Sequence, residues 1–148
     1  MYYHEKQNYV NIFSGIFITA VFAYIVYHRH ITGQIDITGE YKTWGILMLI
    51  FVGISIVARI IIQIIFHIIN AIVTREEEIP KKDERDKMIG LKAIRNAYYA
   101  MSGIMVLTIL FLAVGMPVYG VFIAFVISGL VTELVENSSK IYYYRKGS

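Results

Sequence analysis

The amino-acid sequence predicts an all-α fold: an integral membrane four-helix bundle that forms a single domain over residues 1–148. Three observations predict it. Hydrophobic residues make up 57% of the chain, four long apolar stretches carry most of them, and most of the charge lies in one segment between the second and third stretches. A helix rises about 1.5 Å per residue, so roughly 20 residues cross a bilayer core about 30 Å thick. The apolar runs are continuous rather than alternating, which argues against membrane strands.

The first apolar stretch, Tyr9 to Tyr27, contains no charged residue. It is long for a signal peptide, only Lys6 supplies a basic flank, and no small-residue cleavage site follows, so we expect a retained helix. Gly115-Met116-Pro117 is a turn signal that joins the last two stretches into a hairpin. The predicted membrane helices cover residues of about 9–28, 44–73, 93–115 and 117–140.

A charged segment separates the second and third apolar stretches. Pro80 suits the first turn of a helix, and Asp83 and Lys87 are spaced i,i+4 in the favourable order. We therefore expect a charged cytoplasmic helix over about residues 80–92 that continues into the third membrane helix, with a bend at Gly90.

The distribution of Lys and Arg predicts the orientation of the chain. Eleven of the 14 basic residues lie at the two termini and in the charged segment with its flanks. Arg29 and Lys42 lie on the opposite side, and Arg59 lies inside the second apolar stretch. Because basic residues concentrate on the cytoplasmic side of membranes, both termini and the charged segment are predicted to be cytoplasmic. The four apolar stretches make the lipid bilayer the first predicted partner.

The sequence contains no recognised catalytic or metal-binding pattern. It has no cysteine, which excludes disulfides, thiolate metal sites and a cysteine nucleophile. The histidines form no metal motif, and the pair His28 and His30 is a weak signal. No Ser-His-Asp order, phosphate-binding loop or paired catalytic carboxylates are present. We therefore predict no catalytic residue, no metal, no cofactor and no nucleic-acid partner.

A polar stripe in the second helix is the most informative feature. Ser55, Arg59, Gln63, His67 and Asn70 together span about 120° of the helix surface. Charge is costly in a bilayer, so such a face normally looks into the bundle or into a wet cavity. The alternative is that Arg59 extends to the interface and that His67 and Asn70 already lie there.

The fourth helix offers a counter-charge for Arg59. Measured from Trp44 and Pro117 as marks of the outer interface, Arg59 and Glu133 both lie about 22–24 Å deep. We therefore predict an ion pair between them, which lowers the cost of burying either charge. The alternative is that Glu133 is an ordinary carboxylate at the inner interface.

The inner ends of the helices are also polar, and together they predict a vestibule open to the cytoplasm. It would hold an anionic headgroup, a small ligand or a peptide, or it would be a structural hydrogen-bond network. The predicted vestibule residues are Arg59, Gln63, His67, Arg95, Asn96, Tyr99, Glu133 and Glu136.

Small residues recur at four-residue spacing in the fourth helix: Gly120, Ala124 and Ser128. Small side chains at this spacing allow helices in a membrane to approach closely. The stripe therefore predicts helix packing, either within one chain or between the chains of a homo-oligomer.

The segment Asp83 to Ala93 resembles the Asp-Glu-Arg…Ile…Lys-Ala motif of a family of small predicted membrane proteins of archaea and bacteria, which has no assigned molecular activity. In that family the motif stands on the cytoplasmic side before a late transmembrane hairpin. The resemblance covers about the second half of the chain and implies a prokaryotic inner-membrane protein. It draws attention to Asp83, Glu84, Arg85 and Lys92 as a partner surface.

Three functions are compatible with these observations. The favoured one is a non-enzymatic accessory, regulatory or immunity-type factor that contacts a protein partner through its charged cytoplasmic helix. The second is a small oligomeric transporter or channel with a polar path along the second helix, in which Glu133 or His67 takes up protons. The third is a membrane enzyme that binds an anionic lipid or small ligand in the vestibule, where Arg59 and Arg95 would grip the anion.

Overall fold

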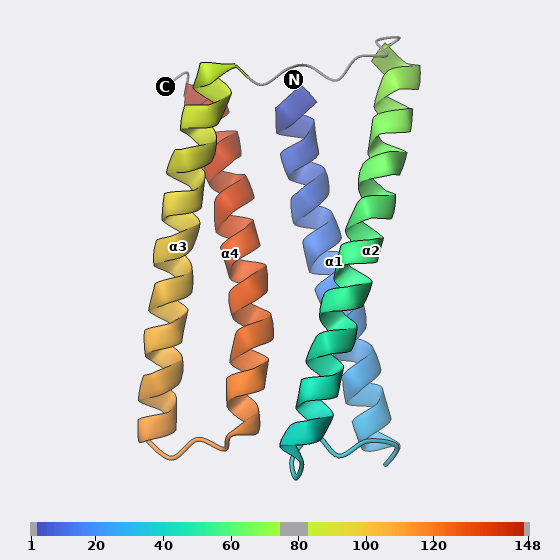
Figure 1. Ribbon diagram of the computed structural model, residues 1–148, viewed down its shortest axis with the longest axis vertical. Coiled ribbons are helices and arrows are strands. Elements are labelled where there is room, and N and C mark those ends of the chain that lie inside the picture. The colour runs from blue at the N-terminus through green and yellow to red at the C-terminus, as the bar shows by residue number, and fades with distance from the viewer. Residues whose placement is uncertain (1–2, 75–82, 147–148) are drawn as a thin grey trace.

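The computed structural model describes residues 3–74 and 83–146, and this part of the chain is helical throughout apart from short connections. Its helices are α1 (Tyr3–Ile31), α2 (Tyr41–Thr74), α3 (Glu84–Ala113) and α4 (Tyr119–Lys146). Each is long and apolar enough to span a membrane. The prediction of four membrane-length helices is therefore confirmed, and the described part of the chain has the all-helical architecture of a multi-pass membrane protein. Figure 1 shows both termini at one end of the elongated bundle, here called the terminal end, and the two short connections at the other.

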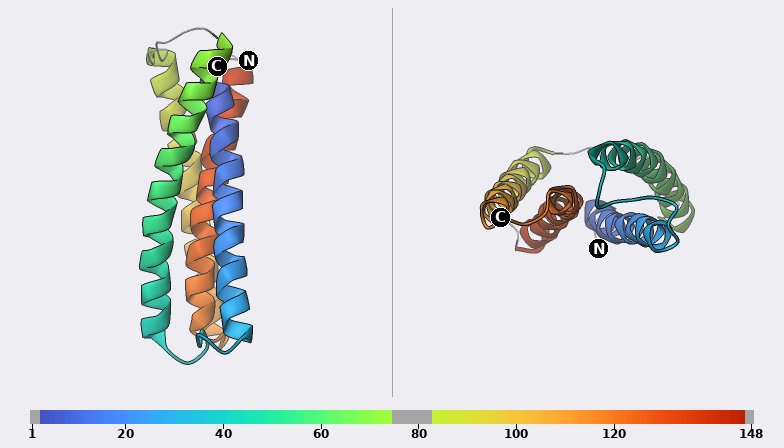
Figure 2. Two further views of the ribbon diagram at one scale, coloured as in Figure 1. Left: turned by 90° about the vertical axis from the view of Figure 1, so that its right-hand side faces the viewer. Right: turned by 90° about the horizontal axis from the view of Figure 1, so that it is seen from below.

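The helices form an open arrangement in which α4 is central. It packs most extensively on α3 and next on α1, whereas α2 packs on α1 and only touches α4. Within the described residues, the backbone of α3 approaches only that of α4, as the view along the bundle in Figure 2 makes visible. Ala93 and Ala97 of α3 and Ser128 of α4 are buried, and small side chains of this kind let two helices approach closely.

The helix boundaries differ from the sequence-based prediction, most clearly in α1, α3 and α4. Helix α1 extends over residues 3–31 instead of 9–28, and α4 over residues 119–146 instead of 117–140. The longer extensions lie at the terminal end, where their polar side chains contact neighbouring helices. Helix α3 begins at Glu84 rather than near Pro80, which lies outside the described residues.

The start of α3 is set by a capping box. The Asp83 side chain accepts a hydrogen bond from the Asp86 amide, and the Asp86 side chain accepts one from the Asp83 amide. Such reciprocal bonds satisfy backbone donors that the first helical turn leaves unpaired. From Glu84 the helix continues without interruption past Gly90 to Ala113, so residues 84–92 and the third apolar stretch belong to one helix and a bend at Gly90 is not required.

The connections at the far end are ordered by specific contacts. Gly115, with φ of 91°, permits the tight α3–α4 hairpin that the sequence predicts there. Trp44, which is 4% exposed, donates from Nε1 to the Ile37 carbonyl at 2.6 Å and stacks on Phe122. In the α1–α2 connection, hydrogen bonds from the Thr38 side chain and amide lower the pKa of Asp36.

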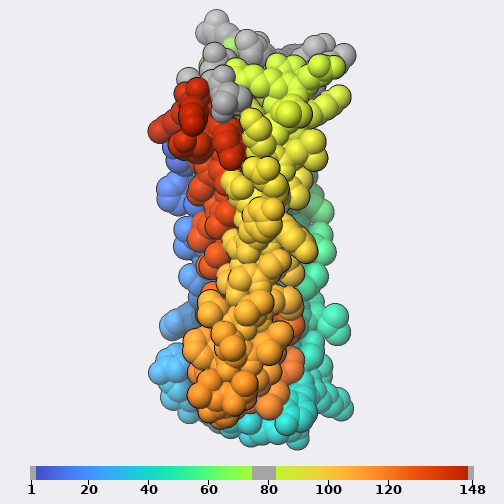
Figure 3. Space-filling model, turned by 90° about the vertical axis from the view of Figure 1, so that its left-hand side faces the viewer, coloured from blue at the N-terminus to red at the C-terminus, as the bar shows by residue number. Residues whose placement is uncertain are grey.

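Apolar side chains cover most of the outer surface. In α2, all of which is described, Trp44 is the only buried residue, and long runs of Ile, Val and Leu are exposed. In Figure 3, α3 forms the front surface along the whole length of the molecule, with α4 visible beside it. Exposed apolar surface on this scale suits contact with lipid rather than water.

Candidate functional site

A polar network joins α1, α2 and α4 in the half of the bundle nearest the terminal end. Its first links connect α1 to α2. The Tyr3 hydroxyl lies 2.5 Å from His67 Nδ1, and Gln7 Nε2 donates to Gln63 Oε1 at 3.0 Å. The polar stripe of α2 therefore turns inward, as one of the two alternatives from the sequence predicted.

Asn11 carries the network from α2 across α1 to α4. Gln63 Nε2 donates to Asn11 Oδ1 at 2.5 Å, and Asn11 Nδ2 donates to Asn137 Oδ1 at 3.2 Å. Asn137, which is buried, in turn donates to the Glu133 carbonyl at 2.9 Å. Amide side chains suit this role because each both donates and accepts, so three helices are fixed in one register.

The network ends in an ion pair between Arg59 of α2 and Glu133 of α4. Both Nη atoms of Arg59 donate to the two carboxylate oxygens of Glu133, in the bidentate geometry that gives Arg–carboxylate pairs their strength. The Glu133 side chain is 13% exposed and that of Arg59 is 44% exposed. The predicted pairing of these two residues is confirmed.

A groove of about 480 Å³ opens beside this ion pair, between α1, α2 and α4. Its walls are polar, and its charges balance, since Arg59 pairs with Glu133 and Lys140 pairs with Glu136 at 2.5 Å. Gln63, Glu133 and Glu136 of the predicted vestibule therefore line one space together with Arg59. His67 lies further along α2, against Tyr3.

The structure does not bring the predicted α3 residues into this groove. Arg95 and Tyr99 are exposed on the outer surface of α3. Asn96 faces α4, where it donates to Ser139 Oγ at 3.1 Å and approaches the Tyr143 hydroxyl at 3.4 Å. The reason is the burial of Ile89, Ala93 and Ala97 against α4, which turns the Arg95 face outward.

A second polar cluster closes the terminal end. The buried Glu5 of α1 accepts a hydrogen bond from Arg145 Nε of α4 at 2.7 Å, and Arg145 also donates to the Tyr9 hydroxyl at 3.0 Å. From α3, Asp86 accepts a hydrogen bond from the Tyr144 hydroxyl at 2.8 Å. Sequence reasoning missed this cluster because Glu5, Asp86 and Arg145 lie outside the apolar stretches that defined the predicted helices.

The predicted partner surface divides into two groups. Asp83 serves as the N-cap of α3, and Lys92 lies over the Tyr143 ring with Nζ 5.4 Å from its centroid. These two residues stabilise the helix and its contact with α4. Glu84 and Arg85 are exposed, so they remain available to a partner.

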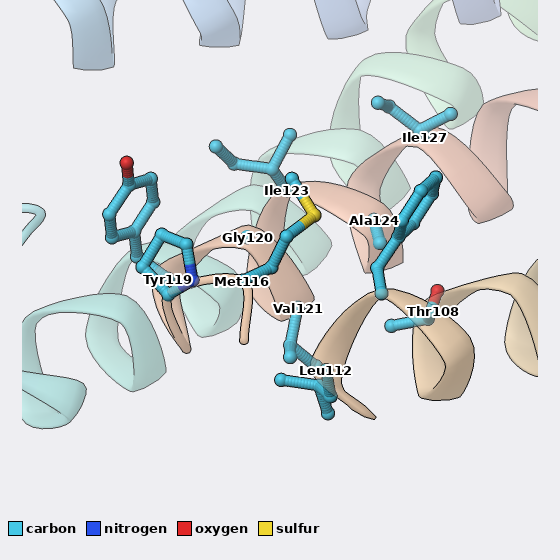
Figure 4. A pocket seen from close by; sticks show the side chains of 11 residues that line it. Thr108, Leu112, Met116, Tyr119, Gly120, Val121, Ile123, Ala124 and Ile127 are labelled. Carbon is cyan, nitrogen blue, oxygen red and sulfur yellow. The ribbon is translucent and has the colours of Figure 1, made fainter. Parts of the chain in front are cut away.

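The small residues of α4 face α3 of the same chain. Gly120 and Ala124 line an apolar cavity of about 330 Å³ with Thr108 and Leu112 of α3, as Figure 4 shows. Ala124 and Ser128 line a second apolar cavity of about 140 Å³ with the same helix. The stripe thus contributes to packing within the chain, which was one of the two alternatives.

Comparison with known proteins returns no relative: no protein-family model, no curated protein and no solved structure matches the chain. The resemblance of residues 83–93 to a family of small prokaryotic membrane proteins therefore stays a prediction.

Proposed function

We propose that this chain is a multi-pass protein of a prokaryotic inner membrane, with both termini in the cytoplasm, that acts as a non-enzymatic accessory or regulatory factor. Its contact surface is the outward face of the first turns of α3, which we call the α3 partner face and define as Glu84, Arg85, Met88, Leu91 and Arg95. The observation that carries the proposal is that, among the described residues, α3 packs on α4 alone and this face is left uncovered.

Depth in the membrane supports this assignment. A count of about 20 residues, roughly 30 Å of helix, inward from Ala113 reaches Ile94. Met88 and Leu91 lie beyond that point, yet they are 55% and 65% exposed. Exposed apolar side chains outside the hydrocarbon region suggest a protein contact, because lipid tails do not cover them there.

The charge of the α3 partner face indicates the chemistry of its partner. Arg85 and Arg95 flank the two apolar residues, and Glu84 supplies the only negative charge of this set. An amphipathic helix with an apolar stripe and an acidic rim would match the surface. Apolar anchors set the affinity of such contacts, and complementary charge sets specificity and the rate of association.

A photo-crosslinking experiment tests the proposal. A photoreactive residue at Leu91 is expected to capture one defined protein in cells, whereas the same residue at Leu107, exposed at membrane depth, is expected to capture only lipid. Arg85→Glu with Arg95→Glu is expected to abolish the Leu91 adduct, and Arg29→Glu, at the opposite end of the bundle, is expected to leave it unchanged. Identical adducts at both positions, or no protein adduct at Leu91, would contradict the proposal.

The groove beside the Arg59–Glu133 pair favours a second candidate function, a small oligomeric transporter or channel. Lysine, arginine, glutamate and amide side chains are uncommon at membrane depth and often mark ion or proton pathways. In this reading Glu133 accepts protons and α2 provides the polar path.

Proteoliposomes that carry a pH-sensitive dye test this second candidate. Under an inward proton gradient, the wild-type protein is expected to acidify the lumen faster than empty liposomes, and Glu133→Gln is expected to remove the difference. Ser102→Ala, on α3 and away from the groove, serves as the matched control. Rates equal to those of empty liposomes would exclude proton transport.

A further inference from the structure

The polar groove beside the Arg59–Glu133 pair is open to the bilayer along one side. It lies between α1, α2 and α4, and because α2 only touches α4, the groove opens between these two helices. Among the described residues, α3 lines no part of the groove, and its backbone does not approach that of α2. Figure 1 shows α2 and α3 on opposite sides of the bundle. A lipid can therefore reach the groove from the side, away from the α3 partner face of the proposed function.

The groove extends from the hydrocarbon core to the interface at the terminal end. Arg59 and Glu133 lie about 22–24 Å from the outer interface, which places them roughly 7 Å inside a core about 30 Å thick. Lys140 also lines the groove and lies about 10 Å further along α4, near the interface. Ile56 and Ile60, which flank Arg59 on α2, are exposed. The deep end of the groove is therefore a polar wall beside side chains that face lipid.

Accessible polar atoms in the groove lack hydrogen-bond partners. Arg59 is 44% exposed, and Glu133 accepts from only two of the five N–H groups of its guanidinium. Glu136 is 32% exposed, and its Oε1 accepts from Lys140. Among the described residues, no group accepts from the other N–H groups of Arg59, and none donates to Glu136 Oε2. Lipid tails offer neither donors nor acceptors, so these atoms call for a polar occupant.

The charges of the groove set the net charge of its best occupant. Arg59 and Lys140 balance Glu133 and Glu136. A ligand with a net charge would leave that charge uncompensated beside hydrocarbon, which is costly. A zwitterion leaves the groove neutral, because its anionic oxygens can accept from Arg59 while its ammonium donates to Glu136 Oε2.

The order of these groups along the groove matches the order of groups in a phospholipid. Glu136 lies about 4.5 Å nearer the terminal end than Glu133, the residue that holds Arg59. A lipid in the leaflet at the terminal end directs its chains toward the membrane centre and its headgroup toward that end. The phosphate therefore lies at the level of Arg59, and an ammonium on a short spacer beyond it lies at the level of Glu136.

We propose that this groove binds the headgroup of an ethanolamine phospholipid, with its phosphate at Arg59 and its primary ammonium at Glu136. The lipid chains stay in the bilayer, in the opening between α2 and α3. A choline headgroup carries the same charges but has no N–H group to donate to Glu136. A free zwitterion shares the headgroup chemistry, but it lacks the chains for which the lateral opening leaves room.

Native mass spectrometry of the full chain in mild detergent tests the proposal. The probes are phosphatidylethanolamine, phosphatidylglycerol, phosphatidylcholine and the soluble headgroup glycerophosphoethanolamine. Phosphatidylethanolamine is expected to bind at least about tenfold more tightly than each other probe, a factor that one hydrogen bond to a charged group supplies. Equal retention of the three lipids, or no retained probe, would overturn the proposal. Equal binding of the soluble headgroup would overturn it in favour of a free zwitterion.

Two single-charge variants test the role of the charge balance. Glu136→Gln leaves the groove with a net positive charge, so phosphatidylglycerol is expected to become the preferred lipid. Lys140→Gln leaves a net negative charge, so phosphatidylethanolamine is expected to stay preferred over phosphatidylglycerol. Both side chains are partly exposed, so both variants are expected to fold. Glu84→Gln, the same change at an exposed residue outside the groove, is the control. An unchanged preference in Glu136→Gln, or a lost one in Lys140→Gln, would contradict the proposal.

A larger side chain in the groove tests where the lipid lies. Gly129 lines the groove, and a Cβ atom there would meet open space. Gly129→Met is therefore expected to fill the space beside Arg59 and to exclude phosphatidylethanolamine, while methionine favours the helix. Gly53→Met also places its Cβ in open space, but outside the groove, and is the matched control. Wild-type retention of the lipid in folded Gly129→Met would place it elsewhere on the protein and overturn the proposal.

Discussion

Gly15 of α1 lies directly against the carboxylate of Glu133 of α4. A Cβ atom built on Gly15 would lie 2.5 Å from Glu133 Oε2 and 2.9 Å from its carboxyl carbon. No side chain other than hydrogen fits while the carboxylate stays where Arg59 holds it. The contact between α1 and α4 and the ion pair between α2 and α4 therefore depend on each other.

Gly15→Ala is expected to push the Glu133 carboxylate away from Arg59 and to lower the free energy of unfolding by about 1–3 kcal/mol, as for other overpacked sites. Denaturant titration in detergent measures this change. Gly53→Ala, where a Cβ would meet open space, is the control and is expected to be neutral or slightly stabilising because alanine favours a helix. If Gly15→Ala lowers the free energy of unfolding by the same amount in a chain that already carries Glu133→Gln and Arg59→Gln, the Gly15 contact and the ion pair are independent.

Removal of one partner of the Arg59–Glu133 pair is expected to destabilise the protein, because the other charge is left without its counter-charge. The cost of breaking a fully buried pair is about 3–5 kcal/mol. Arg59 is 44% exposed, so we expect about 1–3 kcal/mol for Arg59→Gln or Glu133→Gln. The double variant is expected to cost less than the sum of the single variants. Strict additivity in this double-mutant cycle would show that the pair contributes no coupling energy.

Asp83→Ala is expected to loosen the first turn of α3 at a cost of about 1 kcal/mol, since it removes the acceptor for the Asp86 amide. Hydrogen exchange of the α3 amides measures the effect. Faster exchange should be confined to the first turn of α3, where the Asp86 side chain also contacts Tyr144. Glu84→Ala, one residue along and exposed, should leave this exchange unchanged. Equal protection in both variants would mean that the capping box does not form.

The only tryptophan of the chain reports on the α1–α2 connection. Trp44→Phe keeps an aromatic ring against Phe122 but loses the hydrogen bond to the Ile37 carbonyl, so we expect a loss of about 1 kcal/mol. Trp44→Ala also leaves a cavity, and we expect about 3–5 kcal/mol. Thermal unfolding measures both. A similar, small loss of stability in the two variants would show that the Trp44 ring does not pack against Phe122.

The same connection is expected to resist acid. The Thr38 hydrogen bonds that lower the pKa of Asp36 favour its charged form in the folded protein. Their contribution to the stability of the folded protein is therefore complete above the ordinary aspartate pKa of about 3.9. It is lost as the pH falls through the lower pKa that Asp36 has in the folded protein. A carboxyl NMR titration is expected to give an Asp36 midpoint below that value in the wild type and a higher one in Thr38→Val. An unshifted wild-type midpoint would contradict the contact.

Much of the helical plan can be read from the sequence because hydropathy is a local, additive property. Continuous apolar runs predict four helices, and a count of residues from the outer interface places Arg59 and Glu133 at the same depth. That count finds the ion pair because the rise of a helix is constant. The same count does not identify Gly15, which carries no charge. It also does not identify Tyr3 and Gln7, because they precede the predicted start of α1 at about residue 9.

The sequence by itself therefore determined which segments are membrane-length helices and that Arg59 and Glu133 share a depth. Tertiary structure alone decided which face of α3 turns inward. A periodicity of 100° per residue identifies two opposed faces of α3, and only the fit of Ile89, Ala93 and Ala97 against α4 turns Arg95 and Tyr99 outward and Asp86 toward α1. Packing depends on the shapes of two surfaces at once, and no single segment contains that information.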